Sequence, residues 1–191
     1  MTRRVCAHVF LTACAGIFLT GCMPKMTIEE LKQMIPPRPA ELDLLNDFVG
    51  KWESSGEVRF AGLDEVLKTS SSSEIKWEGD GWYLVEHGNF HMDEFGDMEG
   101  LATWVYDSGA KVFRNTWVDS MGGFSVGTAK YDEKTRTWHM KSTNYSSMGK
   151  SKGSGTARFV DDDTMEWDYS EHAMGGLIKV MEMTGTGNRV K

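Results

Sequence analysis

The run Gly123-Phe124-Ser125-Val126-Gly127 matches the Gly-x-Ser-x-Gly pattern that surrounds the nucleophilic serine of many hydrolases. That serine needs a sharp turn between a strand and a helix. Here the run continues into residues 128–131, Thr-Ala-Lys-Tyr, without a helical period. The pattern therefore predicts that Ser125 is one alternating position of a strand, and hydrolase chemistry stays only as an alternative.

Histidine and methionine residues have spacings that could suit a metal. His87 and His91 would share one face of a helix, but in a strand residues four apart lie about 13 Å from each other. Soft copper ligands would have to come from His91-Met92, His139-Met140 or Met181-x-Met183. Scattered methionine more often fills a core. We therefore expect no metal and no cofactor, with metal, copper or single-histidine haem binding as alternatives.

The tightest polar and aromatic cluster is Trp117, Asp119 and Ser120. Trp117 could line a cavity, where Asp119 could hold a polar group of a ligand. Alternatively, Trp117 fills a core while Asp119 and Ser120 cap the turn at residues 121–122 through side-chain to backbone hydrogen bonds. The structural interpretation is favoured, and both remain open at this point.

The N-terminus has the order of a secretory signal, with Arg3 and Arg4 before an apolar run at residues 5–19. Leu-Thr-Gly directly before Cys22 is similar to the bacterial lipoprotein signal, in which cleavage precedes an acylated cysteine. The apolar run falls short of the roughly 20 residues that span a bilayer. We expect residues 1–21 to be a helical signal peptide and Cys22 to be lipidated. The protein would then face the periplasm from the inner or outer membrane.

The charge balance and the positions of the cysteines limit the kinds of partner and of chemistry that we expect. The 191-residue chain has 28 acidic and 21 basic residues, a formal net charge of −7. This balance argues against nucleic acid and against electrostatic docking to anionic lipid, so we expect attachment through acyl chains. The other cysteines, Cys6 and Cys14, lie within the signal. The folded part therefore has no thiolate chemistry and no disulfide.

From Gly50 onward, segments rich in Trp, Tyr, Val, Thr and Phe alternate with turn clusters, which predicts an antiparallel meander. Closure into an up-and-down barrel would remove the two free edges. We therefore expect an all-β barrel domain at residues 41–191. The strands are expected at 50–60, 66–77, 82–92, 98–107, 111–119, 123–131, 136–145, 153–160, 164–171 and 177–186.

Two short helical segments are expected before the barrel. Residues 22–40 read as a tether with one helix, because Thr27 and Glu30 form a capping-box pattern. Residues 41–48 are predicted to form a helical lead-in. Its apolar residues are Leu42, Leu45 and Phe48.

Particular motifs resemble known families. Gly50-Lys51-Trp52 is similar to the Gly-x-Trp opening of lipocalins and other calycins. A wider pattern resembles the bacterial domain-of-unknown-function family 1579, which implies a lipocalin-like barrel and no established reaction. The matching segments are 48–52, 106–107, 112–113, 117–122, 127, 131–132 and 179–183. Two positions depart from it: Val105 replaces a glycine, and Thr-Gly-Thr-Gly at 184–187 stands where an aromatic residue and an arginine are usual.

Seven tryptophans, about one per strand, suit an apolar or flat ligand inside such a barrel. We expect non-covalent binding of a small apolar or amphipathic ligand, and no enzymatic activity. A filled barrel that acts as a protein-interaction module in the envelope is the alternative. The candidate ligand-binding residues are Trp52, Tyr83, His87, Trp104, Asn115, Trp117 and Asp119.

Overall fold

The computed structural model describes residues 26–191, so the predicted signal peptide and Cys22 lie outside the described residues. One short segment ends at Pro37, and a compact unit runs from Arg38 to Lys191. In the first segment, helix α1 (Ile28–Gln33) has the predicted capping box between Thr27 and Glu30. None of the helices within residues 26–191 combines the length and the apolar composition that crossing a bilayer takes.

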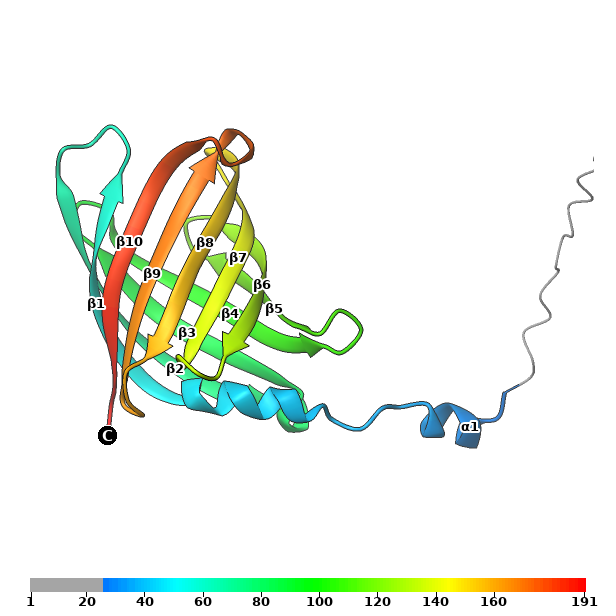
Figure 1. Ribbon diagram of the computed structural model, residues 1–191. Helices are drawn as coiled ribbons and strands as arrows, with labels where there is room; N and C mark the ends of the chain where they lie inside the picture. Colours follow the sequence, from blue (N-terminus) through cyan, green and yellow to red (C-terminus); the bar gives the residue numbers. More distant parts are fainter. Residues whose placement is uncertain (1–25) are drawn as a thin grey trace, which may run out of the picture. The chain divides into compact units, whose positions relative to one another are not determined.

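The compact unit is a closed barrel of ten antiparallel strands in sequence order, with β1 paired to β10 (Figure 1). The predicted all-β barrel is therefore confirmed. Three short 3-10 segments accompany it: η1 (Ala40–Phe48), η2 (Gly79–Gly81) and η3 (Met174–Gly176). The strands are β1 (Gly50–Phe60), β2 (Val66–Glu78), β3 (Tyr83–Met92), β4 (Gly96–Asp107), β5 (Val112–Asp119), β6 (Phe124–Asp132), β7 (Thr137–Ser146), β8 (Gly149–Phe159), β9 (Thr164–Ala173) and β10 (Ile178–Arg189).

Alternation along the strands separates an inner face from an outer face. In β1, Trp52 is buried between the exposed Lys51 and Glu53. Directly paired residues of neighbouring strands point to the same side of a sheet. The pairing of Trp52 with Ser73 on one side and with Arg189 on the other therefore fixes which positions of β2 and β10 face inward.

Figure 1 shows that η1 lies at one end of the barrel. A dense aromatic core fills this end. Leu42, Leu45 and Phe48 of η1 are all buried, as the lead-in pattern predicted. The ring of Phe48 lies 5.9 Å from Trp104 and 5.4 Å from Trp138, measured between ring centroids. Because aromatic side chains bury large apolar areas, this cluster closes one end of the barrel and stabilises it.

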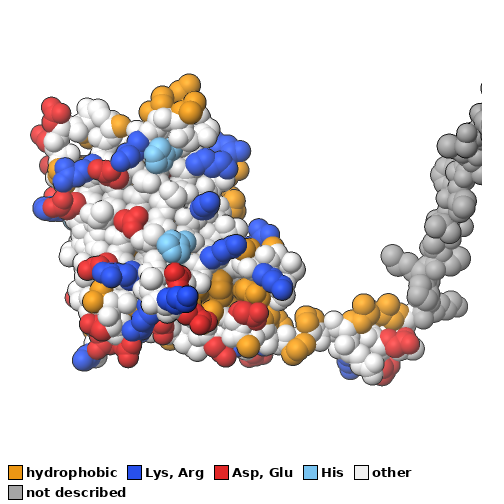
Figure 2. Space-filling model, in the orientation of Figure 1, with side chains coloured by type: hydrophobic (Ala, Val, Ile, Leu, Met, Phe, Trp, Pro, Cys, Tyr) orange, Lys and Arg blue, Asp and Glu red, His pale blue; other side chains and the backbone are white. Residues whose placement is uncertain are grey.

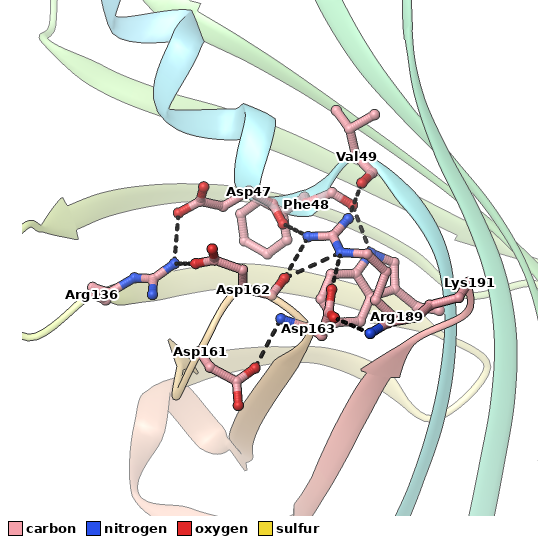
Figure 3. A network of polar contacts seen from close by, with 10 residues as sticks. Asp47, Phe48, Val49, Arg136, Asp161, Asp162, Asp163, Arg189 and Lys191 are labelled. Carbon is pink, nitrogen blue, oxygen red and sulfur yellow. Dashed lines mark hydrogen bonds and ion pairs between the residues drawn. The ribbon is translucent and has the colours of Figure 1, made fainter.

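Arg189 joins the last strand to the first at this closed end (Figure 3). Its guanidinium carbon lies 4.4 Å from the centroid of the Trp52 ring. The same group donates hydrogen bonds to the backbone carbonyls of Val49 and Asp47. An arginine does therefore end the last strand, a few residues beyond the Thr-Gly-Thr-Gly run.

That run has its own packing role. The Trp167 ring lies against Gly185 so closely that a Cβ there would stand 2.3 Å from Cζ2 of the ring. The same ring also reaches Gly56 on β1. Glycine at these positions therefore lets a large ring lie flat along the junction of β1, β10 and β9.

Candidate functional site

The half of the barrel away from η1 has a different interior, which we call the open half. Its inward positions on β3 to β9 hold many small residues, in contrast to the aromatic core. The inward residues that are only partly buried are Glu86, Phe90, Met98, Asn115, Trp117, Ser125, Ser142, Asn144, Tyr169 and Glu171. The glycines and serines among the inward positions leave more room between the walls here than at the aromatic end. Val58 and Leu67 are buried on the β1–β2 side.

The large rings of the open half lie against glycines of the wall. A Cβ on Gly100 would stand 2.3 Å from the Trp117 ring, and one on Gly88 would stand 2.6 Å from the Phe90 ring. The two rings meet edge to face with centroids 5.1 Å apart. Glycine thus lets these rings line the wall, and any larger residue would displace them.

Polar groups on β7, β8 and β9 form one side of the lumen. Tyr169 Oη accepts a hydrogen bond from Asn144 Nδ2 at 2.6 Å and lies 3.0 Å from Ser142 Oγ. Desolvation raises the pKa of Tyr169 above its ordinary value, so the phenol stays protonated. The hydroxyl of Ser151 donates to Glu171 Oε1. This side of the lumen therefore combines a phenol, an amide and a carboxylate.

Glu86 is a carboxylate on the opposite side, on β3. It pairs with Ala102, which in turn pairs with Trp117, so a small residue separates it from the ring. The protein wall surrounds Glu86, and this desolvation raises its pKa even though some of its surface is accessible. A hydrogen bond with the Ser73 side chain acts in the opposite direction. Among residues 26–191, no cation forms an ion pair with Glu86.

Asn115 supplies another acceptor. It pairs with Trp104 on one side and with Gly127 on the other, and therefore faces inward. Its Oδ1 is buried and has no hydrogen-bond partner within the described part of the chain. Buried polar atoms are nearly always paired in folded proteins. The oxygen lies against Gly127, where a Cβ would stand only 2.1 Å from it, so the Asn115 amide packs against the wall of β6.

Five of the seven predicted ligand-binding residues face inward. Trp117 and Asn115 lie in the open half, whereas Trp52 and Trp104 belong to the filled end. Trp52 is buried there, and its Nε1 donates to the Phe48 carbonyl at 2.7 Å. Asp119 faces inward at the rim. Of the candidates in the open half, Trp117 is therefore the main aromatic surface.

Asp119 has the structural role that the sequence favoured. Its Oδ1 accepts hydrogen bonds from the backbone N–H of Met121 at 3.0 Å and of Gly123 at 2.8 Å. Its Oδ2 accepts from Trp117 Nε1 at 3.0 Å. The carboxylate therefore caps the β5–β6 turn and fixes the orientation of the Trp117 ring.

The expected inward orientation of Tyr83 and His87 needs correction. The register pairs Tyr83 with Glu78 and His87 with Glu74, which places both on the outer face. The inward residue between them is Glu86. A shift of one residue moves every side chain of a strand to the other face. Gly88 and Phe90 lie on the same face of β3 as Glu86, and they are the residues whose types could have indicated the inner face.

The catalytic and metal patterns of the sequence do not assemble into sites. Ser125 lies within β6, as predicted, and the chain continues into β7 without a helix. His87 and His91 are both exposed on the outer face. Within residues 26–191, no group of three or more His, Cys, Asp or Glu side chains is placed to hold a metal ion.

Comparison with solved structures supports the barrel fold. The S-type phycobiliprotein lyase CPES from Guillardia theta superposes with a TM-score of 0.58 at 12% identity, covering 87% of this chain and 99% of the lyase. Rv2717c from M. tuberculosis gives a TM-score of 0.63 at 10% identity, covering 81% of this chain and 100% of that protein. These identities show a shared fold and carry no reaction to this chain.

Sequence comparison supplies the family. No curated protein matches the chain. The family described as protein of unknown function, DUF1579, matches residues 39–186, which includes η1 and nearly all of the barrel. The chain is therefore a member of the DUF1579 family.

Proposed function

We propose that this protein is a lipid-anchored binding protein of the bacterial envelope, which holds a small amphipathic ligand non-covalently in the open half of its barrel. The observation that supports this most directly is the contrast between the two ends. One end is filled with buried aromatic side chains, whereas the other has small inward residues, and several of its inward residues are only partly buried. The alternative of a filled barrel that acts only as a protein-interaction module would need the open half to be packed as well.

The polar groups of the open half suggest which end of an amphipathic ligand they would contact. The carboxylates of Glu86 and Glu171 are hydrogen-bond acceptors. The inward strand positions of the open half hold no lysine, arginine or histidine. An anionic head group would therefore meet like charge, whereas a hydroxyl or an amine would find partners. The apolar part would lie against Trp117 and Phe90.

A matched pair of variants tests the site. Ser71 faces the lumen and is paired with Phe90 on the neighbouring strand β3, and Ser72 points outward. Ser71→Leu should fill space in the lumen and weaken binding at least tenfold, whereas Ser72→Leu should leave it unchanged. The probes are 4-phenylbutylamine, 4-phenylbutanol and 4-phenylbutyrate, titrated by calorimetry. The proposal fails if none of the three binds, or if both variants bind them as the parent chain does.

Native mass spectrometry of the protein from its own host complements this titration. A small molecule that co-purifies with the parent chain and is lost from Ser71→Leu would identify the physiological ligand class.

The lipid anchor is proposed from the sequence around Cys22, which lies outside the described residues. A covalent lipid would add the mass of its acyl chains to a chain that begins at Cys22. Intact-mass measurement of the membrane fraction tests this directly. A chain that begins at Met1, or a Cys22→Ala variant that remains as tightly membrane-bound as the parent, would contradict the anchor.

A further inference from the structure

The outer surface of β5 to β8 carries a concentration of positive charge. Arg114, Lys130, Lys141, Lys150 and Lys152 all occupy outward positions on these four strands. The outward positions of the described strands β6 to β8 contain no carboxylate apart from one aspartate at the end of β6. Figure 2 shows lysine and arginine side chains gathered toward this side of the barrel. We call this surface the basic face.

Most of these cations are not neutralised by the protein itself. Arg114 pairs with Asp107 at 2.6 Å. Among residues 26–191, none of the four lysines lies within ion-pair distance of a carboxylate. Lys152 Nζ instead donates to Thr143 Oγ1 at 2.9 Å. The basic face is therefore locally positive, although the whole chain has a net charge of −7.

Exposed apolar side chains continue the basic face toward the open end of the barrel. Val118, Phe124 and Tyr145 pair across β5, β6 and β7, and the row ends at Lys150 on β8. The apolar members are each about two-fifths exposed: Val118 42%, Phe124 43% and Tyr145 42%. Phe124 and Tyr145 stack at 6.0 Å, so the row forms a continuous apolar edge.

A groove lies in the middle of the basic face, with a volume of about 510 Å³. Arg114, Lys141, Lys152 and His172 line it. Three outward hydroxyl residues, Thr128, Thr143 and Ser154, also line it. Cationic groups beside hydroxyl donors are suited to a phosphate group.

We propose that the basic face docks on the surface of an anionic phospholipid bilayer. The lysines would pair with the lipid charges, a lipid phosphate would lie in the groove, and the apolar edge would enter the headgroup region. A free phosphate would use the cations alone and leave the aromatic edge without a role. A bilayer interface accepts both, because basic and aromatic side chains are favourable there. The inference is independent of what the lumen binds.

The experiment places a fluorescent probe on the basic face of the full chain, purified and reconstituted into vesicles. Ser154 is exposed on β8 beside Lys141, and Asn89 is exposed on the outer face of β3, across the barrel. Each is changed to cysteine and labelled with NBD, and the parent chain treated with the same label is the blank. The vesicles contain a nitroxide-headgroup lipid that quenches NBD at the membrane surface, with or without 30% phosphatidylglycerol.

In phosphatidylglycerol vesicles, we expect quenching at Ser154→Cys to exceed that at Asn89→Cys by at least threefold. Reversing Lys141 and Lys152 to glutamate should reduce the equilibrium constant for docking at least tenfold, since each lysine near such a surface contributes a factor of roughly five to that constant. High salt should have the same effect without any substitution. Equal quenching at the two positions, or quenching that ignores lipid charge and salt, would overturn the proposal. A response to inorganic phosphate without vesicle contact would also overturn it, in favour of a free-phosphate site.

Discussion

Replacing Arg189 by methionine tests how the barrel is closed. The substitution keeps most of the apolar stem and removes the guanidinium group. That group donates to the carbonyls of Asp47, Val49 and Asp162 and covers the ring of Trp52 at 4.4 Å. The Arg189 side chain is only 23% exposed, so water cannot fully replace these contacts.

The expected loss follows from the contacts. Hydrogen bonds that involve a charged group contribute about 1.5–3 kcal/mol each, and a cation–π contact contributes about 1 kcal/mol. Because these contributions share one group and are not additive, we expect Arg189→Met to lower the free energy of unfolding by about 3 kcal/mol. For a domain of this size that corresponds to a decrease of about 6–12 °C in Tm.

The measurement is urea and thermal unfolding followed by tryptophan fluorescence. Arg158→Met is the matched control, because Arg158 also ends in an ion pair, with Glu166 at 2.6 Å, but both side chains are about half exposed. Such an exposed pair contributes about 0–1 kcal/mol. A loss at Arg189→Met no larger than that at Arg158→Met would refute the role of Arg189 in closure.

Three further outcomes are expected. Burial raises the pKa of Glu86, so ionisation of its carboxyl group opposes folding. The free energy of unfolding should therefore fall as the pH rises from about 4.5, the ordinary pKa of a glutamate, through the higher pKa of Glu86 in the folded state. In urea titrations, Glu86→Gln should therefore be more stable than the parent near pH 7 and equally stable near pH 4. The control is Glu74→Gln, because Glu74 points outward. A difference in stability that does not change with pH would contradict this prediction. Asp119→Ala should lower the free energy of unfolding by about 1–2 kcal/mol and shift tryptophan emission to the red, because it removes the cap of the β5–β6 turn and the hydrogen-bond partner of the Trp117 indole. Unchanged emission would contradict this prediction. Leu45→Ala should lower the free energy of unfolding by about 2–5 kcal/mol in the same assay, since Leu45 is fully buried. Leu63→Ala should change it little, because Leu63 is exposed.

The fold was largely predictable because a meander depends on local signals. Turn clusters and alternating residues locate strands without knowledge of distant contacts, and the predicted strands agree closely with the observed ones. The lead-in was predictable for the same reason, since Leu42, Leu45 and Phe48 share one side of a short helix. The candidate site was less predictable. Trp117 and Asn115 were identified, whereas Glu86 was missed because alternation does not say which face is the inner one.

The chain by itself determined the number of strands and their order, since both depend on signals in neighbouring residues. Only the tertiary structure decided which residues meet across the closed barrel, such as Arg189 with Trp52. The tertiary structure also placed basic residues together on one part of the surface. The acidic composition argued against contact with anionic lipid, yet strand register gathers Lys130, Lys141 and Lys152 on one outer face. The physical reason is that net charge sums over the whole chain, whereas a surface interacts through the charges that folding places side by side.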